Sequence, residues 1–372
     1  MSSSTVRGRF YWTVWAPILG IVLLVSTWGR DLAGPLVTVI AAFLIGAVLA
    51  AVHHAEVVAH KVGEPFGSLL LAVAVTVIEV ALIVTLMITG DKDTSGLARD
   101  TVFAAIMISI NGIVGLSLLV GALRHHLADF NPEGTGSALA TLIALAGITL
   151  VLPRFTTSEA GPEFTPGQLA FAAVASIALY AMFVFTQTVR HRDFFLPVAK
   201  DGALLDSVEG GDGDGHADPP SAAETRLSLG LLTVALVAVV GLAKVESPAI
   251  EDAVEAAGFP HAVVGVVIAL LVLLPESIAA VRAAAGGRAQ ISLNLAYGSA
   301  MASIGLTIPT IAVASIWLDG PLALGLDDVQ IVLLILSVIV SLLTVAPGRA
   351  KPLQGGVHLV LLAAFLAVTI AP

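Results

Sequence analysis

Two glutamates stand alone in long apolar stretches of the chain. Glu79 is the one ionisable residue in 65–89, and Glu276 is the one ionisable residue in 262–281. Each stretch is long enough to cross a bilayer as a helix, which takes about 20 apolar residues. A carboxylate at that depth costs roughly 2.5 kcal/mol or more, and such residues usually mark a functional site. One such residue in each half of the chain predicts a cation site with Glu79 and Glu276 as its metal ligands.

Two carboxylates alone cannot complete a calcium site, because Ca²⁺ takes about 6–8 oxygen ligands. Further oxygen ligands are expected from hydroxyl and amide side chains in the same stretches or in the ones that follow them, namely Thr76, Ser109, Asn111, Asn294, Ser299 and Ser303. Gly112, Gly298 and Pro275 weaken helical hydrogen bonding, which would free backbone carbonyls to line a cavity.

The same carboxylates can carry protons. Burial favours the neutral acid, whereas a bound cation favours the carboxylate, so a cation and protons compete for one site. If the site must be filled to cross the membrane, this competition produces antiport. The alternative is structural, with both glutamates paired to polar neighbours inside a helix bundle.

The composition identifies a membrane protein. Of 372 residues, 57% are hydrophobic and 12% are charged, against about 25% charged in soluble domains. The net charge of −10, with no basic patch, argues against nucleic-acid binding. The chain has no cysteine, which excludes disulfides, thiolate metal sites and thiol catalysis. No resident cofactor is expected, since Ca²⁺ would be the transported substrate.

Apolar runs separated by Gly, Pro and charged clusters predict an all-α polytopic membrane protein with eleven spans. The first run has no small-residue cleavage site after it, so it is interpreted as an uncleaved span. The ninth run is long and carries Gly298, Gly305 and Pro309, so a bend or break is expected there. The predicted spans are 11–28, 35–60, 65–89, 100–122, 136–152, 167–189, 227–243, 260–283, 289–317, 328–346 and 354–371.

The positively charged residues predict the orientation. With a cytoplasmic N-terminus, 12 of the 17 Lys and Arg residues fall in cytoplasmic segments, and five, including Lys244, fall in external loops. Positive residues concentrate on the cytoplasmic side of membrane proteins. The N-terminus is therefore predicted in the cytoplasm and the C-terminus outside.

The longest loop, 190–225, is acidic and glycine-rich and is predicted to be a cytoplasmic linker. It separates an N-terminal helix in 1–30 and a five-helix repeat in 31–189 from a second five-helix repeat in 226–372. Because five is odd, the two repeats must insert in opposite orientations, a common plan in transporters. Glu79 and Glu276 each lie on the second span of a repeat, so they are expected to meet near the membrane midplane.

Two polar clusters are candidates for a proton path or for regulation. His53, Glu56 and His60 share one face of a helix end, which suits a zinc site, proton entry or an ordinary polar helix end. Asp212, Asp214 and Asp218 lie in the linker but do not form an EF-hand, because alanine occupies the glycine and glutamate positions. A solvated linker or a weak regulatory cation site is expected there.

Two isolated histidines lie in or beside predicted spans of the second half. His261 and His358 each lack a second ligand-type residue nearby in the sequence. Both are predicted to be structural, with their ring nitrogens satisfied inside the bundle or at its interface.

Three stretches resemble a known family: GEPFGSLLLAVAVTVIEVALI (63–83), LLPESIAAVRAA (273–284) and SLNLAYGSAMASIGLTIP (292–309). They are similar to the bacterial ChaA-type calcium/proton antiporters, in the cation/proton exchanger branch of the calcium/cation antiporter superfamily. The resemblance implies one extra helix, two inverted five-helix repeats and an acidic cytoplasmic segment between them. It also implies that Glu79 and Glu276 are the transport glutamates and that Asn111 and 298–303 complete the site.

The resemblance has one departure that bears on the ion. The wider exchanger family usually places Gly-Asn just before each glutamate, whereas this chain has Val75-Thr76 and Val272-Leu273. Fewer side-chain oxygens therefore surround the site, which makes Na⁺ and K⁺ further candidate substrates. The predicted function is a secondary antiporter that exchanges cytoplasmic Ca²⁺, with these further candidates, for external protons. The alternatives are a sodium-driven calcium exchanger, a passive cation channel and, more distantly, a membrane enzyme.

Overall fold

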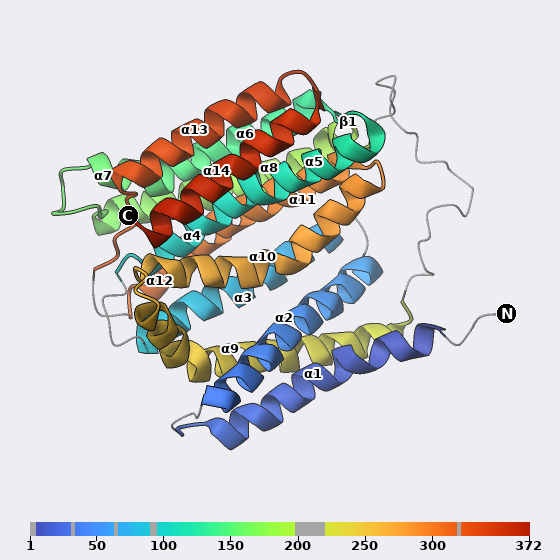
Figure 1. The fold of residues 1–372 in the computed structure, drawn as a ribbon, viewed down its shortest axis with the longest axis vertical. Helices are drawn as coiled ribbons and strands as arrows, with labels where there is room; N and C mark the ends of the chain where they lie inside the picture. The colour runs from blue at the N-terminus through green and yellow to red at the C-terminus, as the bar shows by residue number, and fades with distance from the viewer. Residues whose placement is uncertain (1–4, 31–33, 63–65, 90–94, 198–219, 318–320) are drawn as a thin grey trace. The chain divides into compact units, whose positions relative to one another are not determined.

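The computed structural model describes residues 5–30, 34–62, 66–89, 95–197, 220–317 and 321–372, and helices dominate it (Figure 1). Within these residues, nine helices are long and apolar enough to cross a membrane, and Trp12–Thr27 and Ala74–Ile88 are shorter apolar helices. These helices match the eleven predicted spans one to one. The prediction of an all-α polytopic membrane protein is confirmed. The contacts divide the chain into two compact units.

The first unit, Met1–Thr94 with Asp212–Gly258, holds α1 (Thr5–Thr27), α2 (Gly34–Val62), α3 (Phe66–Thr89) and α9 (Ala222–Ala256). Helix α2 packs against the other three, and α9 also contacts α1 and α3. Small residues bring these helices together, because a Cβ atom at Gly20 would lie 3.3 Å from that of Ala238. Such small-residue contacts are typical of helix pairs in membranes.

Helix α9 is longer than the sequence predicted. The predicted span ends at residue 243 with Lys244 outside, but α9 continues through Pro248 to Ala256. The prediction that Lys244 lies in a loop is therefore wrong. Its Nζ lies 5.0 Å from the centroid of the Trp28 ring, a favourable cation–π contact. The C-terminal end of α9 is thus helical, and Lys244 on it contacts Trp28, the residue after α1.

The second unit, Ser95–Gly211 with Phe259–Pro372, takes helices from both halves of the chain. The units therefore do not coincide with the repeats predicted in 31–189 and 226–372, which stay a prediction. The elements of this unit are α4 (Leu97–Met107), η1 (Ile108–Ile113), α5 (Val114–His125), β1 (Ala128–Asp129), α6 (Pro132–Ala146), η2 (Gly147–Val151), α7 (Leu152–Phe155), α8 (Pro166–Phe185), η3 (Thr186–Arg190), η4 (Arg192–Phe195), α10 (Ala262–Ala285), α11 (Ala289–Ala302), η5 (Ser303–Thr307), α12 (Ile308–Ala314), α13 (Asp328–Val345), β2 (Arg349–Ala350) and α14 (Pro352–Ile370).

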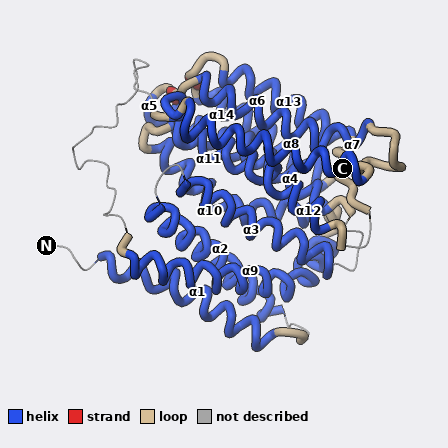
Figure 2. Tube along the Cα trace, turned by 180° about the vertical axis from the view of Figure 1, so that it is seen from behind, coloured by secondary structure: helices blue, strands red, loops and turns tan. Residues whose placement is uncertain are grey.

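The turns of the second unit meet in pairs at opposite ends of its helices. Strands β1 and β2 pair antiparallel, with Ala128 opposite Ala350, and Figure 2 marks the pair in red beside α5. Elsewhere, the backbone N–H of Gly325 donates to Pro162 O at 2.9 Å, and that of Ala323 donates to Ser95 O at 3.1 Å. Each pair joins segments that the sequence predicts on the same side of the membrane. The predicted alternation of spans is thus reproduced in this unit.

Two of the transmembrane helices of this unit contain a π-helical segment in their middle. Segment η1 joins α4 to α5 and contains Gly112, and η5 joins α11 to α12 and contains Gly305. The ninth span, predicted to be bent or broken, runs as one helix from Ala289 to Ala314 that is regular at Gly298 and π-helical at η5. Helix α10 likewise continues through Pro275. Single π-helical turns inside α-helices often occur at functional sites.

Candidate cation site

Glu79 lies on α3 in the first unit, and its side chain is buried at 2% exposure. Thr76 is one turn earlier on the same side of the helix and is also buried. Ile78, Leu82 and Ile83 around it are buried as well. A carboxylate with a hydroxyl one turn away, in an apolar helix, suits the binding of a cation or a proton.

Glu276 lies on α10 in the second unit and is half-buried. Proline has no backbone N–H, so Pro275 cannot donate the helical hydrogen bond to the carbonyl of Leu271. Ser277 donates to Leu273 O at 2.7 Å, so its hydroxyl is bound to the helix that carries it. The Leu271 carbonyl, five residues before Glu276 on the same helix, therefore lacks its helical hydrogen bond.

Glu276 lies at about the depth of η1. Helix α10 packs against α4, η1, α5 and α11. A Cβ atom at Gly265 of α10 would lie 2.9 Å from Thr101 N of α4. Further along both segments, a Cβ atom at Gly121 of α5 would lie 3.4 Å from Ala284 O of α10. Helix α10 therefore runs beside α4, η1 and α5 in the same direction. Glu276 follows Gly265 by eleven residues, and Gly112 of η1 follows Thr101 by eleven.

Asn111 lies in η1 and is completely buried. Its Nδ2 donates to Ser337 Oγ on α13 at 2.8 Å, and its Oδ1 lies 3.1 Å from Nδ1 of His358 on α14. Its amide therefore points to α13 and α14, and one lone pair of Oδ1 is used there. Ser109, also in η1, is completely buried and its hydroxyl has no hydrogen-bond partner among the described residues.

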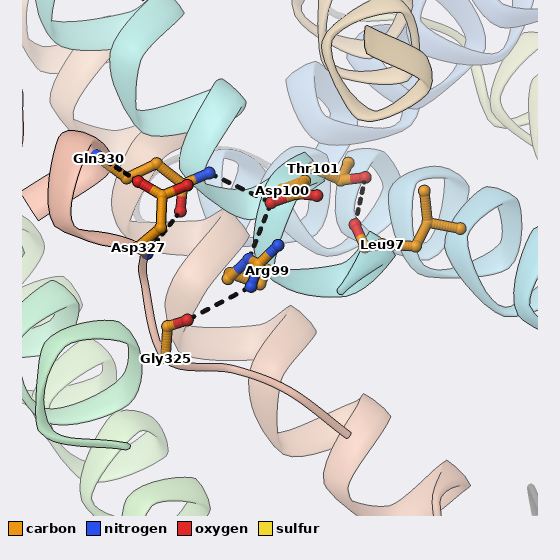
Figure 3. Close-up of polar contacts among 7 residues, drawn as sticks. All are labelled: Leu97, Arg99, Asp100, Thr101, Gly325, Asp327 and Gln330. Carbon is orange, nitrogen blue, oxygen red and sulfur yellow. Dashed lines mark hydrogen bonds and ion pairs between the residues drawn. The ribbon is translucent and has the colours of Figure 1, made fainter. Parts of the chain in front are cut away.

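Helix α4, which leads into η1, is anchored at its other end (Figure 3). Asp100 Oδ1 accepts from Arg99 Nε at 2.8 Å and from Gln330 Nε2 at 3.2 Å. Gln330 also exchanges hydrogen bonds with Asp327, the N-cap residue of α13. Helices α4 and α13 are thus joined near their N-terminal ends and again at Asn111 and Ser337, which fixes the position of η1.

Segment η5 and the turn before it hold part of the predicted ligand set. Ser303 is the first residue of η5 and is buried, whereas Ser299, one turn earlier on α11, is half-buried. Thr307 ends η5, and its buried hydroxyl has no hydrogen-bond partner among the described residues. Segment η5 contacts α4, so these hydroxyls belong to the same unit as η1 and α10.

Asn294 lies apart from the other predicted ligands of this unit. Its Nδ2 donates to Phe195 O at 2.7 Å, and its Oδ1 accepts from Gln290 Nε2 at 2.8 Å. It precedes Ser303 by nine residues on α11, which is roughly 13 Å along a helix. Asn294 therefore fastens the segment after α8 to α11, and the structure does not bring it next to Ser303.

The histidine cluster of α2 is only partly buried. Glu56 and His60 are exposed and His53 is half-buried. His54 is the buried member, and its ring contacts Thr13 O on α1 at 3.1 Å and Ser228 Oγ on α9 at 3.3 Å. In the described part of the chain, no group of three or more His, Cys, Asp or Glu side chains is placed to hold a metal ion. The zinc interpretation of this cluster thus finds no support.

The remaining candidates lie outside the described residues, namely Asp212, Asp214 and Asp218.

The structure also shows polar residues that the sequence did not lead us to predict. Ser337, Ser341 and Thr344 are buried on α13 at a spacing of four and then three residues, which places them on one helix face. That pattern in an otherwise apolar span is a signal that could have identified them.

Residues 33–189 and 227–371 match the family described as sodium/calcium exchanger protein. The chain belongs to this family. A putative ionic transporter, y4hA of Sinorhizobium fredii, is 44% identical over 97% of this chain and 96% of its own length. The sodium-potassium/proton antiporter ChaA of Escherichia coli is 34% identical over 94% and 93%. The chain is therefore a cation antiporter of the exchanger family and not an enzyme.

Solved structures of exchangers have the same fold. Native YfkE superposes with a TM-score of 0.72 at 15% identity and covers 98% of this chain and 99% of its own. The H⁺/Ca²⁺ exchanger CAX also gives 0.72, at 16% identity, over 98% of this chain and 89% of its own. At these identities the likeness concerns the fold alone, and it agrees with the exchanger family.

Proposed function

We propose that this exchanger is a secondary antiporter that expels cytoplasmic Ca²⁺ in exchange for external protons by alternating access. The observation that carries the proposal is the pair of isolated glutamates, Glu79 buried on α3 and Glu276 half-buried on α10. Each lies within an apolar membrane helix, where an uncompensated charge is costly. Each can lower that cost by binding a cation or a proton.

The exchange follows from competition at these carboxylates. A bound cation requires the ionised form, and its departure leaves a buried charge that favours protonation. If the site changes sides only when it holds the cation or protons, no ionised and unpaired carboxylate has to move through an apolar environment. The oxygens of Thr76, Ser109, Asn111, Ser299 and Ser303 are the proposed additional ligands.

Na⁺ and K⁺ are further candidate substrates. The positions just before the glutamates hold Val75-Thr76 and Val272-Leu273, which supply a single side-chain oxygen between them. The relative ChaA, at 34% identity, is named a sodium-potassium/proton antiporter, whereas a relative from Aphanothece halophytica at 24% identity is named a Ca²⁺/H⁺ antiporter.

The proposed location is the inner membrane of a prokaryote, with the N-terminus in the cytoplasm and the C-terminus outside.

The test uses purified protein in liposomes that contain a pH dye, challenged in turn with Ca²⁺, Na⁺, K⁺ and Mg²⁺. We expect cation-dependent proton movement that Glu79→Gln and Glu276→Gln each abolish, because a neutral amide can neither release a proton nor balance a cation's charge. Exchange that needs Na⁺ and ignores an imposed pH step would show sodium coupling instead. A cation flux without proton movement would indicate a channel, and normal exchange in either Gln variant would refute the glutamate site.

A further inference from the structure

A chain of buried polar groups links η1 to the last two helices. Asn111 Nδ2 donates to Ser337 Oγ at 2.8 Å, Asn111 Oδ1 lies 3.1 Å from His358 Nδ1, and His358 Nε2 lies 3.2 Å from Thr344 Oγ1. Asn111, Ser337 and His358 are completely buried, and Thr344 is 3% exposed. The chain joins residues up to 247 positions apart in the sequence.

The orientation of the Asn111 amide sets the other hydrogen-bond roles in this chain. With its nitrogen donating to Ser337, its oxygen faces the imidazole and accepts. His358 Nδ1 therefore carries the hydrogen, and Nε2 accepts from the hydroxyl of Thr344. Both ring nitrogens are satisfied by a neutral imidazole, so the arrangement needs no charge on His358.

Small residues bring the imidazole to η1. A Cβ atom at Gly115, one turn after Asn111, would lie 2.9 Å from His358 Cβ. One at Gly355, one turn before His358, would lie 2.5 Å from Leu119 N and 2.7 Å from Gly115 O. Helices α5 and α14 therefore approach closely at the point where His358 meets Asn111, as small residues permit in membrane helix pairs.

We propose that His358 is a positioning residue that sets cation affinity by holding Asn111 and η1 in place. The proposal rests on the proposed function, because it takes η1 as part of the cation site. Segment η1 lies at about the depth of Glu276 and packs against α10. The imidazole fixes which way the Asn111 oxygen points and leaves its second lone pair for a ligand. Partners of this kind change metal affinity by about 10- to 100-fold when removed.

The two ring nitrogens can be tested separately. An asparagine amide reaches about as far as Nδ1, and a glutamine amide reaches about as far as Nε2. His358→Asn therefore keeps a donor for Asn111 and loses the contact with Thr344, whereas His358→Gln does the opposite. Neither side chain titrates, so neither can replace the imidazole as a proton carrier.

The experiment measures cation-dependent proton movement in liposomes, with KM for Ca²⁺ and kcat determined separately, and thermal unfolding in detergent. We expect His358→Leu and His358→Gln to raise KM about 10-fold or more, with kcat changed much less. We expect His358→Asn to keep KM within about 3-fold of the wild type. His54→Gln is the matched control, because His54 is also completely buried with two polar contacts; it should lower the unfolding temperature without raising KM.

The outcomes separate the two proposals. No exchange by the wild-type protein overturns the proposed function and this inference with it. Exchange by the wild type with an unchanged KM in His358→Leu overturns the inference alone. Loss of proton movement in both His358→Asn and His358→Gln, with wild-type unfolding, also overturns it, since that would make the imidazole a proton carrier. If His358→Leu does not fold, the contrast between the Asn and Gln variants decides.

Discussion

Two of the π-helical segments, η1 and η5, interrupt the middle of a membrane span, and the contacts around them differ. Segment η1 is fixed by hydrogen bonds from Asn111 to Ser337 and His358. Segment η5 packs against α8, where a Cβ atom at Gly305 would lie 2.8 Å from Tyr180 Cβ and 3.0 Å from its ring carbon Cγ. The described contacts of η1 thus include directional hydrogen bonds to other helices, whereas those of η5 include a close contact with an aromatic side chain.

The difference shows that two helices with a π-helical segment at mid-span can be held by different kinds of contact. Hydrogen bonds specify the direction of a ligand group, whereas packing mainly specifies how closely two helices approach. The polar contacts at η1 fix the orientation of the Asn111 amide. The aromatic contact at η5 holds the backbone that carries the hydroxyls of Ser303 and Thr307.

The largest effect on stability is expected where η5 meets α8. Tyr180→Ala should lower the free energy of unfolding by about 3 kcal/mol, because it removes a large buried ring and leaves a cavity. Unfolding in mixed detergent micelles measures this change. If Tyr180→Ala costs less than His358→Leu, the proposed contrast between a packed segment and a hydrogen-bonded one is wrong.

A smaller effect is expected at the close approach of α5 and α14. Gly355→Ala should destabilise the protein by about 2 kcal/mol, since the added methyl meets the backbone of Leu119 and Gly115. It should also raise the KM for the cation, because separating these helices moves His358 away from Asn111. Gly356→Ala is the neighbouring control, with nothing within 4 Å of its added methyl. Equal unfolding of the two variants would contradict the close-packing account.

The smallest effects on stability are expected from two buried hydroxyls, one with a hydrogen-bond partner and one without a partner among the described residues. Ser337→Ala should cost about 1 kcal/mol of unfolding free energy, because it leaves the Asn111 amide with only the weak sulfur acceptor of Met107, at 3.7 Å. Thr307→Val should cost nothing measurable, because its hydroxyl has no partner among the described residues. A loss of stability in Thr307→Val equal to that in Ser337→Ala would show that η5 also depends on hydrogen bonds.

Much of the fold was predictable from local sequence. All eleven spans were recognisable because a bilayer demands long apolar runs, and the turns were marked by Gly, Pro and charged clusters. The exception is the C-terminal end of α9, where Lys244 was predicted in a loop but the helix continues to Ala256. The contact of Lys244 with Trp28 joins residues far apart in the sequence, which local composition could not reveal.

The candidate site was predictable only in its charged residues. Glu79 and Glu276 stand out because a lone carboxylate in an apolar run is rare and costly. Asn294 was grouped with the other ligands because it shares their span, yet it binds Phe195 and Gln290 instead. Side-chain type and span membership do not say which face of a helix a residue occupies or what it meets there.

The sequence by itself determined an eleven-span α-helical membrane protein with one isolated carboxylate in each half, because apolar length and isolated charge are local properties. Only the tertiary structure decided how η1 is held. His358 was predicted to be a structural histidine, and its satisfied ring agrees with that. Its partner Asn111 lies 247 residues away, and such a pair forms only because Gly115 and Gly355 let two distant helices touch.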